Sequence, residues 1–289
     1  MSRKFDYFPD DEYEKLVVKE FDLMPSGERE LHPHGTYDPV PGVTSLGWNK
    51  WKEEPAADFV KSLIDWQDGY VRDNYQKTGY NADDPIYRGE LGLDDLKRRY
   101  SNQIASSSQM FEFEGLAALR AHLMGAREVR DLIRRHYYEE CGHNEMLVDF
   151  MVGAFGMDRV NEVYPLQNPL NWSTARRKKW EMIERLGTKG HFVELAATNM
   201  LWERSIPKHN RMQAYGLRKH YKIPNKFLMF FDIHSYIDIY HSRYGMYILS
   251  KYCTTKELQE KAESAFKEWV SLSDLGVREG VQVLQVDKR

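Results

Sequence analysis

Apolar residues recur every three or four positions along most of this chain, and that spacing predicts α-helices. Between residues 54 and 75, for example, Phe59, Leu63, Trp66 and Tyr70 repeat at helical intervals. Strand-like alternation is nearly absent, and only residues 277–289 show it. The pattern therefore predicts an all-α protein. The expected helices cover residues 54–75, 110–125, 126–158, 174–186, 191–209, 227–247 and 254–275, with a further helical passage starting at residue 94.

Domain organisation follows from the same pattern. Residues 1–50 are polar and interrupted by several prolines, so we expect an irregular N-terminal arm. The remaining residues, 51–289, show no repeat and no low-complexity tract. With 289 residues and 34.2 kDa the chain can bury a sizeable core. We therefore expect residues 51–289 to form a single helical domain.

Composition narrows the possible classes of protein. Lys and Arg total 41 and Asp and Glu total 44, so the net charge of -3 favours no nucleic-acid partner. Cys141 and Cys253 are the only cysteines, which excludes a disulfide framework or a Cys-rich zinc site. No apolar run approaches the ~20 residues that span a bilayer, and the N-terminus lacks a signal-peptide core. We expect a cytoplasmic protein that does not act at a membrane.

The aromatic stretch 227–247 contains three residues with the chemistry of metal ligands. His234, Asp238 and His241 are offset by four and seven positions, which places them on one stripe of a helix. Their neighbours are apolar, and unpaired charges in an apolar environment cost several kcal/mol or more. A metal ion would satisfy all three groups. The alternative is two hydrogen-bonded core histidines and a surface aspartate.

Other segments supply candidate partners for this stripe. Glu140 and His143 form an E-x-x-H pair, a spacing that helical di-iron proteins use. Glu203 lies just before Pro207. Glu194, nine residues earlier on the same expected helix, faces the opposite side, about 180° around the axis. An exposed Glu203 could instead pair with Arg204 or Lys208. Glu112 and Glu114 begin the helix at 110–125, where acidic residues also favour the helix dipole.

The order of these motifs resembles the haem-oxygenase-like di-iron oxidases and oxygenases. The matching elements are E-x-x-H at 140–143, a Glu before an x-I-P step at 203, and FF-x-x-H-x-x-x-D-x-x-H at 230–241. The resemblance covers roughly residues 100–255. It implies a bundle of about seven helices that holds two Fe(II) ions. By this resemblance the metal ligands are Glu140, His143, Glu203, His234, Asp238 and His241.

The resemblance also implies a reaction class. We expect an oxidoreductase that activates O2 and oxygenates the amine nitrogen of a small metabolite, with no catalytic residue beyond the metal ligands. Family members that oxygenate amines draw an extra Glu from the preceding helix, and Glu114 is favoured over Glu112 for this role. Alternatives are oxidative C–C cleavage or decarboxylation of an amino acid or fatty acid, and a metal-free thiaminase-like hydrolase with Cys141 as nucleophile. We further expect an external electron donor and a homodimer.

Overall fold

The computed structural model describes residues 56–78, 84–107, 112–140, 142–168, 170, 172–235 and 237–286. All regular structure in these residues is helical, which confirms the predicted all-α class. The expected arm at 1–50 lies outside the described residues, so that domain boundary stays a prediction. The longer helices are α4 (Asp58–Thr78), α6 (Leu93–Ser107), α7 (Glu112–Leu123), α8 (Arg127–Glu140), α9 (His143–Phe155), α10 (Thr174–Thr188), α12 (Ile206–Lys219), α14 (Ile237–Tyr252) and α15 (Lys256–Val286).

Shorter elements complete the bundle and connect the longer helices. They are α5 (Asp84–Arg88), α11 (Phe192–Leu195), α13 (Met229–His234), the π-helical turns η2 (Arg159–Val163) and η5 (Ala196–Met200), and the 3-10 turns η3 (Tyr164–Gln167), η6 (Leu201–Ser205) and η7 (Asn225–Phe227). None of the helices in the described residues has the length and apolar character that a bilayer span requires.

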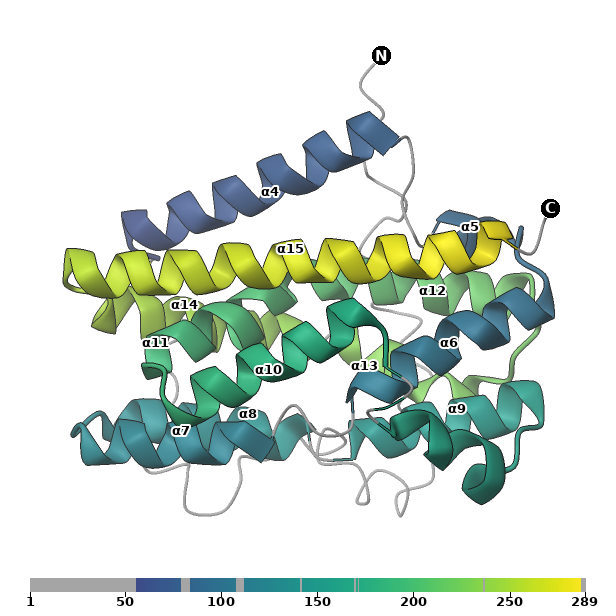
Figure 1. Cartoon of the computed structure of the whole chain (residues 1–289), viewed down its shortest axis with the longest axis horizontal. Coiled ribbons are helices and arrows are strands. Elements are labelled where there is room, and N and C mark those ends of the chain that lie inside the picture. The colour runs from purple at the N-terminus through teal and green to yellow at the C-terminus, as the bar shows by residue number, and fades with distance from the viewer. Residues whose placement is uncertain are drawn as a thin grey trace.

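Helix α15 runs along the length of the bundle, with α4 on its outer side (Figure 1). It packs on α10 and α11, while α14 packs on η5 and η6 behind it. Helices α7 and α8 lie against each other, and α6 packs on α9. This arrangement surrounds α14 with other helices and places most of its side chains in the interior.

Two apolar cores fill the bundle. The first core joins α4, α7, α8, α10, α11, α14 and α15 and includes Leu63, Ile133, Tyr244, Phe266 and Trp269. The second core joins α5, α6, α9, α12 and α13 and includes Ile86, Leu96, Tyr100, Phe150 and Phe231. In the second core the rings of Tyr100, Phe150 and Phe231 meet edge to face, with centroids 4.7 to 5.3 Å apart.

The prediction of a strand-like C-terminus is wrong. Residues 277–286 continue α15, and residues 287–289 lie outside the described part. Extending an existing helix adds one hydrogen bond for each residue that is ordered, whereas a lone strand has no neighbour to pair with. The valines in this segment therefore follow the helix that precedes them.

Three of the predicted helices are divided in the structure. The segment 126–158 forms α8 and α9, and the segment 227–247 forms η7, α13 and α14. The segment 191–209 remains helical but passes through α11, η5, η6 and the start of α12. The breaks after α8 and α13, like the η5–η6 segment, contribute side chains to one polar cluster inside the bundle.

Candidate metal centre

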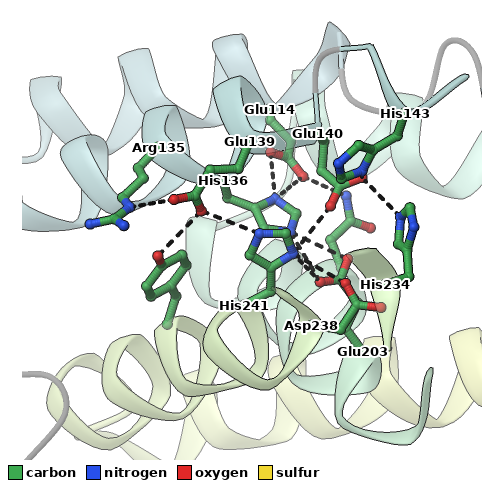
Figure 2. A network of polar contacts seen from close by, with 12 residues as sticks. Glu114, Arg135, His136, Glu139, Glu140, His143, Glu203, His234, Asp238 and His241 are labelled. Atoms are coloured by element: carbon green, nitrogen blue, oxygen red, sulfur yellow. Dashed lines mark hydrogen bonds and ion pairs between the residues drawn. The ribbon is translucent and has the colours of Figure 1, made fainter. Parts of the chain in front are cut away.

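Nine titratable side chains from six elements converge in the interior of the bundle, and we call this group the Glu/His cluster (Figure 2). All nine are buried, and none is more than 8% exposed. Seven of them were expected from the sequence. The cluster consists of Glu114 from α7, His136, Glu139 and Glu140 from α8, His143 from α9, Glu203 from η6, His234 from α13, and Asp238 and His241 from α14.

The break between α8 and α9 places Glu140 and His143. The two residues were expected on one continuous helix, but Glu140 ends α8 and His143 begins α9. Gly142 turns the chain between them with φ of 94°, a left-handed conformation that favours glycine. The side chains nevertheless meet, because Nδ1 of His143 lies 2.7 Å from Oε2 of Glu140. The predicted pairing therefore holds although the predicted single helix does not.

A second break, between α13 and α14, separates His234 from Asp238 and His241. The expectation that one helix carries all three residues is wrong, since His234 is the last residue of α13. Nδ1 of His234 donates a hydrogen bond to the carbonyl oxygen of Phe230 at 2.7 Å. That bond leaves Nε2 as the nitrogen that faces Glu140 Oε2, at 3.6 Å.

Glu203 reaches the cluster because its segment packs closely on α14. A Cβ atom at Gly245 would lie 2.6 Å from the backbone nitrogen of Leu201, so only glycine allows this approach. Oε2 of Glu203 lies 3.0 Å from Nδ1 of His241. As the nine-residue spacing predicts, Glu194 lies elsewhere: it accepts a hydrogen bond from the backbone of His191 and caps α11.

Two groups within the cluster have the spacing of metal-ligand sets. In the first group one ligand atom from each of His136, Glu140, Glu203 and His241 lies within 4.8 Å of the others. The second group consists of Glu140, His143 and His234 at the same spacing. Atoms bound at about 2.1 Å to one ion lie about 3 to 4 Å from one another, so both groups fit a metal. Glu140 belongs to both groups and therefore can join two ions.

Several buried atoms of the cluster lack hydrogen bonds. Among the described residues, neither carboxylate oxygen of Asp238 has a hydrogen-bond partner, and the same is true of Oε1 of Glu140. Nε2 of His241 also lacks a hydrogen bond, although it lies within ion-pair distance of Oε2 of Glu139. Buried polar groups are normally satisfied, because leaving one unpaired costs about 1–3 kcal/mol. A cation bound among these oxygen and nitrogen atoms would satisfy them.

The electrostatics of the cluster show how strongly its members depend on one another. Burial raises the pKa of Asp238 to about 7 and lowers that of His143 to about 4. Burial also opposes charge on His234, but Asp238 and Glu140 raise its pKa to about 9. Burial acts against ionisation of Glu140 as well, yet the facing histidines hold its pKa well below the usual range. Glu140 is thus kept ionised by the histidines that face it, whereas burial outweighs the facing histidines at Asp238.

Sequence reasoning missed two members of the cluster, His136 and Glu139. Oε1 of Glu139 accepts a hydrogen bond from Nε of Arg135 at 2.6 Å, and Oε2 accepts one from the Tyr244 hydroxyl at 3.2 Å. Oε2 also lies 3.3 Å from Nε2 of His241, so Nδ1 of that ring faces Glu140 and Glu203. The signal was present: His136, Glu139, Glu140 and His143 are spaced at offsets of three, four and seven.

The remaining predicted candidates have separate outcomes. Glu114 is fully buried within the cluster, whereas the side chain of Glu112 and the whole of Cys141 lie outside the described residues. The placement of Glu114 excludes the alternative of an exposed acidic helix start.

Comparisons with known proteins agree with this architecture. Residues 92–274 match the protein family described as iron-containing redox enzymes. A domain of unknown function with a heme oxygenase-like fold from Shewanella denitrificans is 14% identical, with a TM-score of 0.61 over 79% of this chain and 92% of that chain. A TenA homologue from Pseudomonas syringae pv. tomato is 10% identical, with a TM-score of 0.62 over 78% of this chain and 94% of that chain. No curated protein matches the sequence.

Proposed function

The chain belongs to the family of iron-containing redox enzymes with a haem-oxygenase-like fold, and on this basis we propose that it is a non-haem di-iron oxygenase. Its substrate is a small nitrogen-containing metabolite, and its reaction is oxygenation of an amine nitrogen. The observation that carries this proposal is the Glu/His cluster, in which two ligand groups share Glu140 inside an apolar bundle.

The donor types favour iron over other metals. The cluster offers carboxylates and imidazoles and no thiolate among the described residues, a set that suits iron or manganese. Its charge also fits two divalent cations. Arg135 neutralises Glu139, and the four other carboxylates, when ionised, carry four negative charges that balance two divalent cations. The proposed ligands are Glu140, His143, Glu203, His234, Asp238 and His241.

Each side chain has a distinct task in this proposal. Glu140 spans the two groups through its two oxygens, which face His241 and His143 respectively. The bond from His234 to the Phe230 carbonyl holds the ring in one orientation, as neighbours of metal-bound histidines commonly do. Buried Phe230, Ile233 and Ile237 exclude water from that side of the cluster. Bound iron supplies the reduction and activation of O2, chemistry that no amino-acid side chain provides.

An additional carboxylate supports oxygenation of nitrogen over fragmentation of the substrate. Glu114 adds a buried negative charge beside the two groups, and this charge favours retention of both cations while substrate approaches. The overall reaction transfers one oxygen atom of O2 to nitrogen and reduces the other to water. It consumes two electrons and two protons, which we assign to an external donor.

Two alternatives remain to be tested against this proposal. Oxidative C–C cleavage or decarboxylation would use the same ions on an amino acid or a fatty acid. A metal-free hydrolase is the second alternative, since the TenA homologue has a similar fold. The buried cluster argues for the metal enzyme, because carboxylate oxygens of Asp238 and Glu140 lack hydrogen bonds among the described residues and a bound cation would satisfy them.

The proposal is tested by loading the apo-protein with Fe(II) under anaerobic conditions and then adding 18O2, a reductant and a panel of amines. Binding of two Fe(II) ions and one 18O atom in an N-hydroxylated product is the expected result. A product that has lost carbon from the substrate would contradict N-oxygenation and support the C–C cleavage alternative. Absence of iron binding, together with hydrolytic activity, would overturn the oxygenase proposal altogether.

A further inference from the structure

His136 is buried in the middle of the Glu/His cluster, although no motif of the sequence assigns it a role. Its exposed fraction is 0%, and its ring lies 4.3 Å from the ring of His241, centroid to centroid. Nε2 faces the carboxylate of Glu203, with oxygens at 3.2 and 3.3 Å. Nδ1 faces the carboxylate of Glu114, with oxygens at 2.9 and 3.0 Å. The two nitrogens therefore have different surroundings.

The Nε2 side of His136 belongs to a ligand group. The separations of 3.2 Å from His136 to Glu203 and 3.0 Å from Glu203 to His241 match neighbouring atoms around one ion. Oε1 of Glu140 lies 3.1 Å from the same nitrogen of His241 and completes the set. All four side chains fall within the 4.8 Å spacing. An ion bound here has His136 among its nearest neighbours.

The Nδ1 side has the features of a contact that orients a ligand. Both oxygens of Glu114 lie against this nitrogen, and Oε1 also accepts a hydrogen bond from Nδ2 of Asn199 at 2.9 Å. Asn199 lies in the π-helical turn η5, four residues before Glu203. A carboxylate that accepts a hydrogen bond from Nδ1–H of an imidazole fixes the tautomer in which Nε2 has a lone pair for a metal. In this arrangement Glu114 orients His136, and Nε2 of His136 faces the position of the ion.

We propose that His136 is a direct ligand, through Nε2, of the ion held by Glu203 and His241, and that Glu114 and Asn199 act through it. This inference rests on the proposed metal-dependent function and deepens it. It changes the assignment of Glu114, which the family resemblance makes a ligand: here Glu114 positions His136. The first group then supplies two imidazoles and two carboxylates to its ion, and the second supplies Glu140, His143 and His234. Asp238 lies beside the first group, with Oδ1 3.4 Å from Nδ1 of His241.

The test compares four variants by anaerobic titration with Fe(II) alone, one of them with added imidazole. His136→Gln should lose the tight binding of one of two ions, weakening it by at least about 100-fold, whereas Glu114→Gln should keep both with affinity lower by roughly 10- to 100-fold. His122→Gln is the matched control, since His122 is exposed on α7. Adding imidazole to His136→Gly should restore the second ion. Circular dichroism of each apo-protein checks that its helices are intact.

Direct coordination has its own readout in Co(II)-loaded protein. Each bound imidazole gives one strongly shifted, exchangeable N–H proton resonance in the NMR spectrum. We expect one such resonance to disappear in His136→Gln and the full set to remain in Glu114→Gln. An unchanged set and unchanged stoichiometry in His136→Gln would overturn the inference, as would loss of the ion in Glu114→Gln to the same extent. A wild-type protein that binds no iron would instead overturn the proposed function.

Discussion

Helix α15 and the junction between α8 and α9 differ both in the regularity of their backbone and in the side chains that they bury. Helix α15 continues for 31 residues, and its buried side consists of apolar residues such as Phe266 and Trp269. The α8–α9 junction is interrupted by Gly142, and its buried side carries Glu140 and His143. Apolar side chains need only to leave water, so a regular helix serves them well. Ligand side chains must converge on one place, and the left-handed turn at Gly142 lets Glu140 and His143 meet although they lie in different helices.

The two regions also differ in how their members depend on one another. Each apolar residue of α15 contributes its burial largely on its own, at roughly 25 cal/mol per Å². Each charged residue of the cluster is tolerated only because an opposite charge or a cation faces it. Substitutions in the first region should therefore change stability, and substitutions in the second should change metal binding.

The largest expected effect is on metal binding, in His241→Ala. The imidazole faces the carboxylates of Glu139, Glu140 and Glu203, and its removal deletes a proposed ligand. Iron affinity should fall by at least about 100-fold and O2-dependent turnover should cease, while the far-ultraviolet circular dichroism spectrum stays helical. Unchanged iron stoichiometry and turnover would contradict the assignment of this region as a metal centre.

The converse substitution is Phe266→Ala in α15. This ring is fully buried in the first core, and truncating a buried aromatic side chain costs about 3–5 kcal/mol. Chemical unfolding of the apo-protein should show that loss, and the folded variant should still bind iron with wild-type stoichiometry. If iron binding fell in proportion to stability, the two regions would not be separable.

Two glutamates of one helical segment sharpen the comparison further. Glu203→Ala should weaken iron binding at one of the two sites, because its carboxylate faces both His136 and His241. Glu194→Ala removes a helix cap and should cost at most about 2 kcal/mol of stability without affecting iron. Iron titration and thermal unfolding of both variants provide the measurement. The reverse pattern would show that Glu203 has no part in the site.

Regular helices are predictable in this chain because their apolar period repeats over many residues, as in α15. The order of Glu140, Glu203 and His234 along the sequence is likewise enough to indicate a metal centre. The breaks were not predictable, because the helical period continues on both sides of Gly142 and of Ser235. His136 was missed for a different reason: its offsets of four and seven to Glu140 and His143 place it on their stripe, but that spacing alone does not show that Glu114 and Glu203 face its two nitrogens.

A smaller effect on stability is expected from a substitution at the break between α8 and α9. Gly142 has φ of 94°, and no atom lies within 4 Å of a Cβ added there, so Gly142→Ala tests backbone conformation without a clash. The left-handed conformation should cost the variant about 1–2 kcal/mol. Gly115→Ala is the matched control: it is equally uncrowded but lies within α7, and it should stabilise by about 0.5–1 kcal/mol. Equal effects of the two substitutions in unfolding experiments would argue against a strained junction.

The smallest expected effect concerns one cation in the apolar region. The ammonium of Lys179 on α10 lies 4.4 Å from the ring centroid of Trp269 and 5.0 Å from that of Trp202. In the Glu/His cluster, by contrast, carboxylates face the histidines. Burial, with a smaller contribution from nearby Arg176, lowers the pKa of Lys179 to about 7. The attraction between the cation and the two rings opposes this shift by about 0.5–2 kcal/mol.

The sign of the pH dependence decides which of these two effects is larger at Lys179. If burial is larger, the unfolded chain binds more protons between the folded pKa of about 7 and the unfolded value near 10.5, so stability rises with pH across that window. The Lys179→Met variant lacks this gain. Its advantage over the wild type should be greatest below pH 7 and should shrink towards pH 9, by no more than about 1.4 kcal/mol per pH unit. If the stability difference between the variant and the wild type were constant from pH 6 to 9, the two rings would stabilise the ammonium as well as water does. This cation would then need no carboxylate.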